Sequence, residues 1–246
     1  MEGCGSMIVL PAMPPEQTAS WWGILDLHER LAEGWTLIGG QLVHLHCAER
    51  GQFLVRPTND ADTVIDVRAD PTMLATFTET LTDLGFRSAG ISAEGLQHRW
   101  VRGKASIDVL LPDGIGERAS LRQGVTGSPT LPTAGGTQAL QRSETVRVSV
   151  AGREGSVRRP NLVGALVGKA AALSNAGDPG LGRHRRDFVV LAGLLTARDF
   201  RNQELTRKDR RRLRAMVTAV GKDRTLLIEI PDVQISLDRL ITAGEL

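Results

Sequence analysis

Cysteine and lysine are scarce in this sequence, which has two cysteines, Cys4 and Cys47, and four lysines among its 246 residues. Two cysteines are too few for a disulfide framework or a structural zinc site, so we expect both to be reduced thiols. No apolar run approaches the roughly 18 residues of a membrane-spanning helix. Glu2 and several prolines stand where a secretory signal peptide needs a basic start. We therefore expect a cytoplasmic protein with no membrane partner.

Several short enzyme motifs are also missing. The sequence contains no Gly-x-Ser-x-Gly elbow, no Walker P-loop and no dinucleotide-binding fingerprint, so hydrolase and Rossmann-type functions lack support. His44 and His46 do not form a predicted zinc pair, because helical zinc ligands usually lie four residues apart and these two project to different sides. We expect both histidines to be packed or at the surface.

The composition is that of a globular protein, with 41% hydrophobic and 24% charged residues. Residues 1–150 hold 12 Lys or Arg against 17 Asp or Glu, a net charge of −5, and residues 151–246 hold 18 against 11, a net charge of +7. This division suggests carboxylates gathered for a metal in the first part and cations gathered for an anionic partner in the second. Random variation of the surface is the alternative.

Apolar periodicity predicts an α+β fold, in which a mixed β-sheet with flanking helices is followed by a C-terminal helical part. The boundary between the two domains is expected at residues 150 and 151. In the first domain we expect helices at 16–31, 41–48 and 71–84, and strands at 35–38, 60–67, 86–91, 96–101 and 105–111. Residues 112–144 are rich in turn formers and predict loops, including Gly135-Gly136-Thr137, with a short element near 138–140. In the second domain we expect helices at 162–173, 186–195, 206–220 and 233–241.

The chemically informative residues lie within residues 36–67, from the first expected strand into the second. Asp60 and Asp62 lie two apart on a strand, so their carboxylates share one face and repel each other unless a cation lies between them. Carboxylate oxygens suit Mg²⁺. Gly39 and Gly40, between a strand and a helix, allow the backbone to approach phosphate oxygens near the helix N-terminus. The alternatives are a plain turn for the glycines and a solvated strand edge for the acids.

Asp108 supplies a third carboxylate, within the apolar strand at 105–111. A buried acid without a partner is costly, so Asp108 requires either a metal shared with Asp60 and Asp62 or a salt bridge to a strand neighbour such as Arg99 or Arg102. Asp66 has the same parity as Asp60 but lies about 13 Å beyond Asp62, which is too far to join the cluster.

The order of Gly39-Gly40, Asp60-Ala-Asp62 and the later Asp108 resembles the DNA polymerase beta-like nucleotidyltransferase superfamily. The lead-in Arg56-Pro-Thr58-Asn-Asp60, together with Lys169 and the Arg-His-Arg-Arg-Asp segment at 183–187, resembles the AbiEii-type toxins of type IV toxin–antitoxin systems. The resemblance spans residues 35–195. Gln41 departs from it, since Ser or Thr is more usual after the glycine pair, and the interval from Gly40 to Asp60 is long.

The resemblance implies a Mg²⁺-dependent enzyme that transfers a nucleoside monophosphate from a nucleoside triphosphate to an acceptor hydroxyl. The implied catalytic residues are Asp60, Asp62, Asp108, Lys169 and Asp187, of which the first three hold metal. The implied nucleotide-binding residues are Gly39, Gly40, Arg56, Thr58, Lys169 and Arg186. The implied acceptor is a tRNA end, and an antitoxin protein is an implied partner. A nucleotidyltransferase acting on a small molecule such as an antibiotic, and an inactive nucleotide- or partner-binding module, are the alternatives.

Two features of the basic part have alternative interpretations. Lys169 interrupts an apolar helix, so its ammonium group needs an anion or water, and it contacts either the triphosphate or Asp187 in a structural ion pair. The run Arg207-Lys-Asp-Arg-Arg-Arg-Leu-Arg214 is the densest positive stretch. It is either a solvated helix face or a contact surface for an RNA backbone.

Overall fold

The computed structural model describes residues 6–53, 56–175 and 180–246. The chain divides into two compact units, Met1–Pro160 and Asn161–Leu246. The division falls after Pro160, ten residues beyond the expected position, because residues 143–160 form one hairpin that lies within the first unit. The predicted α+β fold, with a mixed sheet followed by a helical part, is confirmed.

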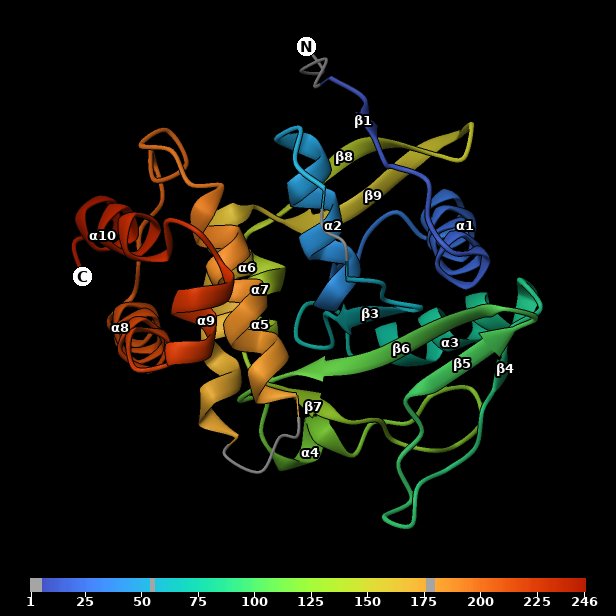
Figure 1. Cartoon of the computed structure of the whole chain (residues 1–246). Coiled ribbons are helices and arrows are strands. Elements are labelled where there is room, and N and C mark those ends of the chain that lie inside the picture. The colour runs from blue at the N-terminus through green and yellow to red at the C-terminus, as the bar shows by residue number, and fades with distance from the viewer. Residues whose placement is uncertain (1–5, 54–55, 176–179) are drawn as a thin grey trace. The chain divides into compact units, whose positions relative to one another are not determined.

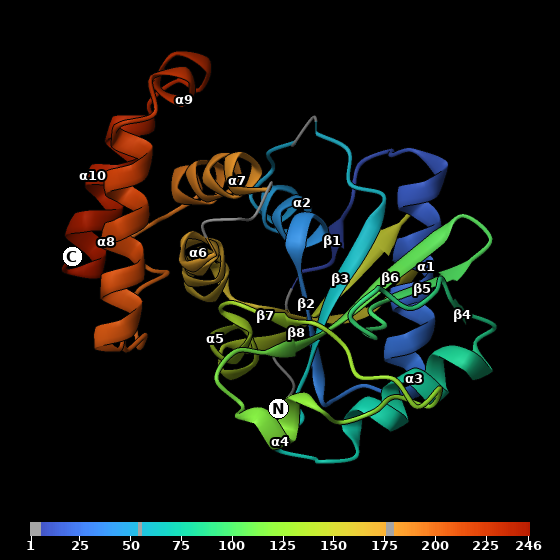
Figure 2. The same cartoon turned by 90° about the horizontal axis from the view of Figure 1, so that it is seen from below.

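The first unit contains two β-sheets (Figure 1). The central sheet has the strand order β2-β3-β6-β5-β4, with β7 beside β6. Its β3–β6 and β6–β7 pairs are parallel and its other pairs are antiparallel. The strands of this sheet are β2 (Trp35–Ile38), β3 (Asp60–Ile65), β4 (Arg87–Ser88), β5 (Arg99–Arg102), β6 (Ala105–Pro112) and β7 (Pro132–Thr133). Figures 1 and 2 show β6 lying between β3 and β5.

The second sheet has the order β1-β8-β9 and pairs the start of the described chain with its middle. Its strands are β1 (Ile8–Val9), β8 (Ser143–Val150) and β9 (Arg153–Pro160). The apolar pattern did not predict the β8–β9 hairpin. The reason lies in β9, where Arg159 is 2% exposed and so occupies an inward position that a hydrophobic residue normally takes. Its guanidinium is paired with Glu49 at 2.7 Å and Glu144 at 3.2 Å.

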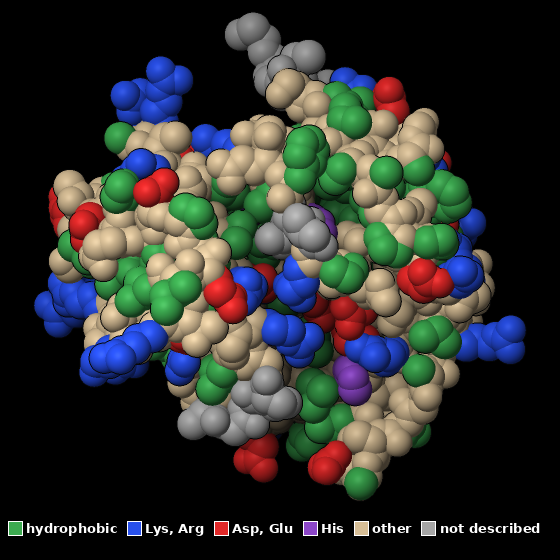
Figure 3. Space-filling view, viewed as in Figure 1, with side chains coloured by type: hydrophobic (Ala, Val, Ile, Leu, Met, Phe, Trp, Pro, Cys, Tyr) green, Lys and Arg blue, Asp and Glu red, His purple; other side chains and the backbone are tan. Residues whose placement is uncertain are grey.

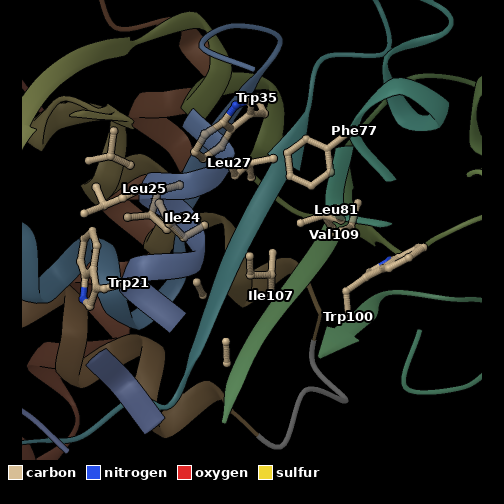
Figure 4. Close-up of a cluster of buried hydrophobic side chains, with 14 of the residues drawn as sticks. Trp21, Ile24, Leu25, Leu27, Trp35, Phe77, Leu81, Trp100, Ile107 and Val109 are labelled. Atoms are coloured by element: carbon tan, nitrogen blue, oxygen red, sulfur yellow. The ribbon is translucent and has the colours of Figure 1, made fainter. Parts of the chain in front are cut away.

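Helix α1 contributes much of the core of the first unit. Its buried apolar residues Trp21, Ile24, Leu25 and Leu27 recur at helical spacing and pack with Ile107 and other residues of the sheet (Figure 4). The helices of this unit are α1 (Pro15–Arg30), α2 (Gly39–Glu49), α3 (Met73–Asp83), α4 (Glu117–Ser120) and α5 (Gly136–Gln141). The expected loop at Gly135-Gly136-Thr137 is wrong in part, because Gly135 is a left-handed N-cap and Gly136 begins α5.

The second unit is helical. Its elements are α6 (Leu162–Ala171), the 3-10 turn η1 (Ala172–Ser174), α7 (Leu181–Gly193), α8 (Arg207–Gly221), α9 (Arg224–Glu229) and α10 (Val233–Gly244). Helices α8 and α10 run alongside each other (Figures 1 and 2). The predicted helices are present, although α7 begins five residues early, and the short α9 was not predicted. Within the described residues, every helix is too short or too polar to cross a membrane.

Candidate active site

The three strand acids converge in the first unit. Strands β3 and β6 run parallel with Asp62 opposite Asp108 and Asp60 opposite Ser106. One carboxylate oxygen from each of Asp60, Asp62 and Asp108 lies within 4.8 Å of the others, and we call these three residues the carboxylate triad. Asp108 is buried, whereas Asp60 and Asp62 are half-buried, so the triad is open to solvent on one side.

Gly39 fits closely against the triad. It follows Ile38, which lies opposite Asp62 on the paired strands, and its φ of +72° favours glycine. A Cβ atom at Gly39 would lie 1.7 Å from Oδ2 of Asp62. Any side chain at this position would therefore displace the Asp62 carboxylate.

The segment that leads into β3, residues 56–59, is held in place by close packing and hydrogen bonds to the start of α2. A Cβ atom at Gly40 would lie 2.6 Å from Oγ1 of Thr58, and the Thr58 hydroxyl donates to Oδ1 of Asp60 at 3.3 Å. Gln41 is fully buried and donates to the Thr58 carbonyl at 2.9 Å. Gln41, the residue that departs from the resemblance, thus supplies an amide that positions the segment before β3.

Three further residues support this segment and were missed from the sequence. Gln17 of α1 donates to the Gln41 side chain at 3.1 Å, and Ser20 donates to the Asn59 carbonyl at 2.6 Å. His44 Nε2 lies 2.6 Å from the Arg56 carbonyl. Polar residues on the buried faces of α1 and α2 were the available signal, because a buried polar group requires a hydrogen-bonding partner.

Arg99 of β5 is the cation beside the triad. It lies opposite Asp108 in the antiparallel register, and its Nε and Nη2 donate to the two Asp108 carboxylate oxygens at 2.8 and 2.7 Å. Nη2 also lies 3.0 Å from Oδ2 of Asp60. The hydrogen bond with Asp108, followed by the charges of the neighbouring acids, raises the pKa of Arg99. Of the two predicted salt-bridge partners, Arg99 contacts Asp108, and Arg102 contacts Asp26 instead.

The triad has the chemistry of a divalent-cation site. Its three donors are carboxylate oxygens, which are hard ligands of the kind Mg²⁺ takes, and the backbone of Gly39 makes room for one of them. Among residues 6–53, 56–175 and 180–246, it is the one group of three or more His, Cys, Asp or Glu side chains with this proximity. Asp66 is outside this group, as expected, and Oδ1 of Asp66 accepts from the Ala69 amide at 3.1 Å.

The two histidines of α2 are packed, as expected. His46 is fully buried, with Nε2 3.1 Å from the Pro160 carbonyl and Nδ1 2.7 Å from Nη1 of Arg159. Burial, and then the Arg159 charge, lowers the pKa of His46 to about 4. A neutral ring that donates from Nε2 and accepts at Nδ1 satisfies both contacts. Cys47 is also buried in α2, and Cys4 lies outside the described residues.

The remaining predicted site residues belong to the second unit. Lys169 of α6 and Asp187 of α7 form an ion pair, with 2.8 Å between Nζ and Oδ2 and side chains that are 7% and 3% exposed. Arg186 is paired with Glu229 of α9. The ion pair predicted as the alternative role of Lys169 is therefore present within this unit.

Neither a family model nor a curated protein matches the sequence. Among solved structures, the fold is similar to an antigenic nucleotidyltransferase-like protein from Paracoccidioides brasiliensis, with a TM-score of 0.52 and 14% identity over 92% of this chain and 94% of that one. The antibiotic-resistance factor ANT(2'')-Ia also matches, with a TM-score of 0.45 and 15% identity over 85% of this chain and 97% of that one. The first likeness shows that the chain has a nucleotidyltransferase-like fold.

Proposed function

We propose that this protein is a nucleotidyltransferase that moves a nucleoside monophosphate from a nucleoside triphosphate to an acceptor hydroxyl. The observation that carries the proposal is the convergence of Asp60, Asp62 and Asp108 within 4.8 Å of one another, on a nucleotidyltransferase-like fold. Acids so close together favour a cation between them, and a carboxylate-bound divalent cation attracts phosphate groups.

The proposed reaction joins the acceptor oxygen to the α-phosphorus and breaks the bond from that phosphorus to pyrophosphate. When bound by Asp60, Asp62 and Asp108, Mg²⁺ would neutralise developing charge on the phosphates. The backbone at Gly39 and Gly40, the Thr58 hydroxyl and the Arg56 guanidinium would hold the triphosphate. Asp108 would favour loss of the acceptor proton to solvent.

In the second unit, the AbiEii resemblance assigns nucleotide contacts to Lys169 and Arg186 and a catalytic role to Asp187. We include these roles in the proposal. Both cations already have an acidic partner within the unit, Asp187 for Lys169 and Glu229 for Arg186. A triphosphate would therefore compete with these acids for the same positive charges.

The proposed acceptor is RNA, and the resemblance favours the end of a tRNA. The second unit has 15 Lys or Arg against 10 Asp or Glu, a net charge of +5, and Arg207, Arg211 and Arg214 are exposed on α8. Figure 3 shows Lys and Arg side chains over this helix, at the lower left. Both proposed substrates are cytoplasmic molecules, so we expect the enzyme to act there, with an antitoxin protein as a regulatory partner.

The test is incubation of the purified protein with α-phosphate-labelled nucleoside triphosphates, Mg²⁺ and total RNA. We expect labelled RNA with the wild type and none with Asp60→Asn. Asp66→Asn is the matched control, because Asp66 shares the strand parity of Asp60 but lies outside the triad. Label on a small molecule in place of RNA would retain the transfer reaction and reject the acceptor. No label on any molecule, with the wild type equal to Asp60→Asn, would reject the enzyme.

A further inference from the structure

We propose that Arg99 is the resident counter-ion of the carboxylate triad, which a divalent cation displaces from Asp60 while Arg99 stays bound to Asp108. The inference rests on the proposed function, because it concerns the same metal site. It makes Arg99 a positioning residue that sets the metal affinity of the triad.

Strand pairing fixes Arg99 beside the third acid. Arg99 lies directly opposite Asp108 on β5 and β6, and its guanidinium fork meets both oxygens of that carboxylate, at 2.8 and 2.7 Å. This two-point contact holds the Asp108 side chain in one orientation. The contact with Asp60 is different, because it uses Nη2 alone, at 3.0 Å.

The contacts of Arg99 with Asp108 and with Asp60 differ in strength because the two acids differ in burial. The Asp108 side chain is 9% exposed, whereas the side chains of Asp60 and Arg99 are 38% and 44% exposed. Water screens an ion pair between exposed groups, so the contact between Arg99 and Asp60 is the weaker one. An incoming cation would therefore take Asp60 from Arg99 more readily than it would take Asp108.

The net charge of the triad also favours displacement of Arg99 from Asp60 by a divalent cation. Three ionised carboxylates carry a charge of −3, and Arg99 reduces this to −2, which one divalent cation balances. Without Arg99, the triad would bind a cation more tightly but would be strained by repulsion in the metal-free protein. Arg99 therefore lowers the metal affinity of the triad and stabilises the triad when no metal is bound.

Calorimetric titration with Mn²⁺, without nucleotide, tests this exchange. We expect Arg99→Gln to bind Mn²⁺ roughly tenfold more tightly than the wild type, because a competing positive charge is removed. Saturating Mn²⁺ should also raise the melting temperature of Arg99→Gln by more than that of the wild type. The matched control is Arg102→Gln, which removes an arginine of the same strand that pairs with Asp26, and its Mn²⁺ affinity should stay within about twofold of wild type.

Arg99→Lys serves as a second variant, because it keeps a positive charge at this position. It lacks the guanidinium fork, so we expect an intermediate gain of about threefold in Mn²⁺ affinity. The inference is wrong if neither Arg99 variant binds Mn²⁺ more tightly than the wild type and Arg99→Gln lowers the melting temperature equally with and without Mn²⁺. Arg99 would then only stabilise the fold. If the wild type and Arg99→Gln both bind Mn²⁺ no better than Asp60→Asn, the triad holds no metal, and the proposed function fails with it.

Discussion

Gly39 is the residue on which the geometry of the triad depends most directly. We expect Gly39→Ala to abolish Mn²⁺ binding and nucleotidyl transfer, because its methyl group would occupy the position of the Asp62 carboxylate. Unfolding by urea should show a loss of about 1–3 kcal/mol, from the positive φ together with the clash.

Gly51→Ala is the control for backbone strain alone. Gly51 has a similar φ of +66°, but a Cβ atom there would meet no atom within 4 Å. We expect it to lose about 1 kcal/mol and to keep full Mn²⁺ binding. Equal Mn²⁺ affinity in the two alanine variants would contradict the packing of Gly39 against Asp62.

His46 predicts a specific dependence of stability on pH. Its pKa is about 4 in the folded protein and about 6.5 in the unfolded chain, so only the unfolded chain binds a proton between these values. The contribution of His46 to stability is therefore complete above pH 6.5 and declines as the pH falls to about 4. The total is about 3 kcal/mol, from a shift of roughly 2.5 units at 1.36 kcal/mol each.

Urea unfolding of the wild type and His46→Gln at several pH values measures this contribution. The variant cannot titrate at this position, so its stability should fall less steeply with acid between pH 6.5 and 4, by up to about 1.4 kcal/mol per pH unit. Parallel pH profiles would show that folding does not lower the pKa of His46.

The residues of the triad could be predicted from the sequence because strand parity and the order of the motif fix them. Asp60 and Asp62 share a face at any strand register, and Arg99 was one of two arginines expected beside Asp108. The supporting network could not be predicted. Gln17 and Gln41 are 24 residues apart in the sequence, and only the tertiary fold brings their side chains together.

At the scale of elements, prediction succeeded where apolar residues follow one period. Strand β2 and helix α2 have the expected positions because a buried run is followed by a glycine pair and a second apolar run. The β8–β9 hairpin could not be found in this way. Arg159 is buried and pairs with the partly exposed Glu49, so a charged residue takes an inward position and breaks the alternation that marks a strand.

The packing of α6 against α7 yields a prediction about Lys169. We expect Lys169→Met to lower the free energy of unfolding by about 3 kcal/mol, because Asp187 would lose a buried cation 2.8 Å away. The double variant Lys169→Met with Asp187→Leu should recover much of this loss, since no buried charge remains. Urea unfolding of the single and double variants measures the coupling between the two side chains.

Activity measured on the same variants separates the structural role of Lys169 from a nucleotide contact. If Lys169→Met keeps the wild-type stability and loses transfer, the ion pair contributes little and Lys169 serves the nucleotide. If the double variant is stable and still transfers nucleotide, neither residue is needed for the reaction. The assignment of Lys169 and Asp187 to catalysis would then be wrong.

At the scale of the whole molecule, the sequence predicted two domains of opposite charge but placed their boundary ten residues early. With the boundary after Pro160, the first unit carries 15 basic and 18 acidic residues, a net charge of −3, against +5 for the second. The asymmetry persists, although it is smaller than the expected −5 and +7. The net charge of the first unit rises by 2 because β9 brings Arg153, Arg158 and Arg159, together with Glu154, into this unit.

This asymmetry predicts that RNA binding depends on salt through the exposed face of α8. Arg207, Arg211 and Arg214 are exposed there at helical spacing, whereas Arg210 donates to the Leu205 carbonyl at 2.7 Å. If the three exposed arginines contact phosphates, the log–log slope of affinity against salt should fall in magnitude by about 2 when all three become Gln, at about 0.7 per phosphate on a single strand.

The control is a triple variant of the first unit. Arg30, Arg87 and Arg118 are exposed there, and their replacement by Gln removes the same charge. Filter binding of labelled tRNA between low and high salt measures the slopes. Equal slopes for the two triple variants would show that net charge alone matters and that α8 is a solvated face.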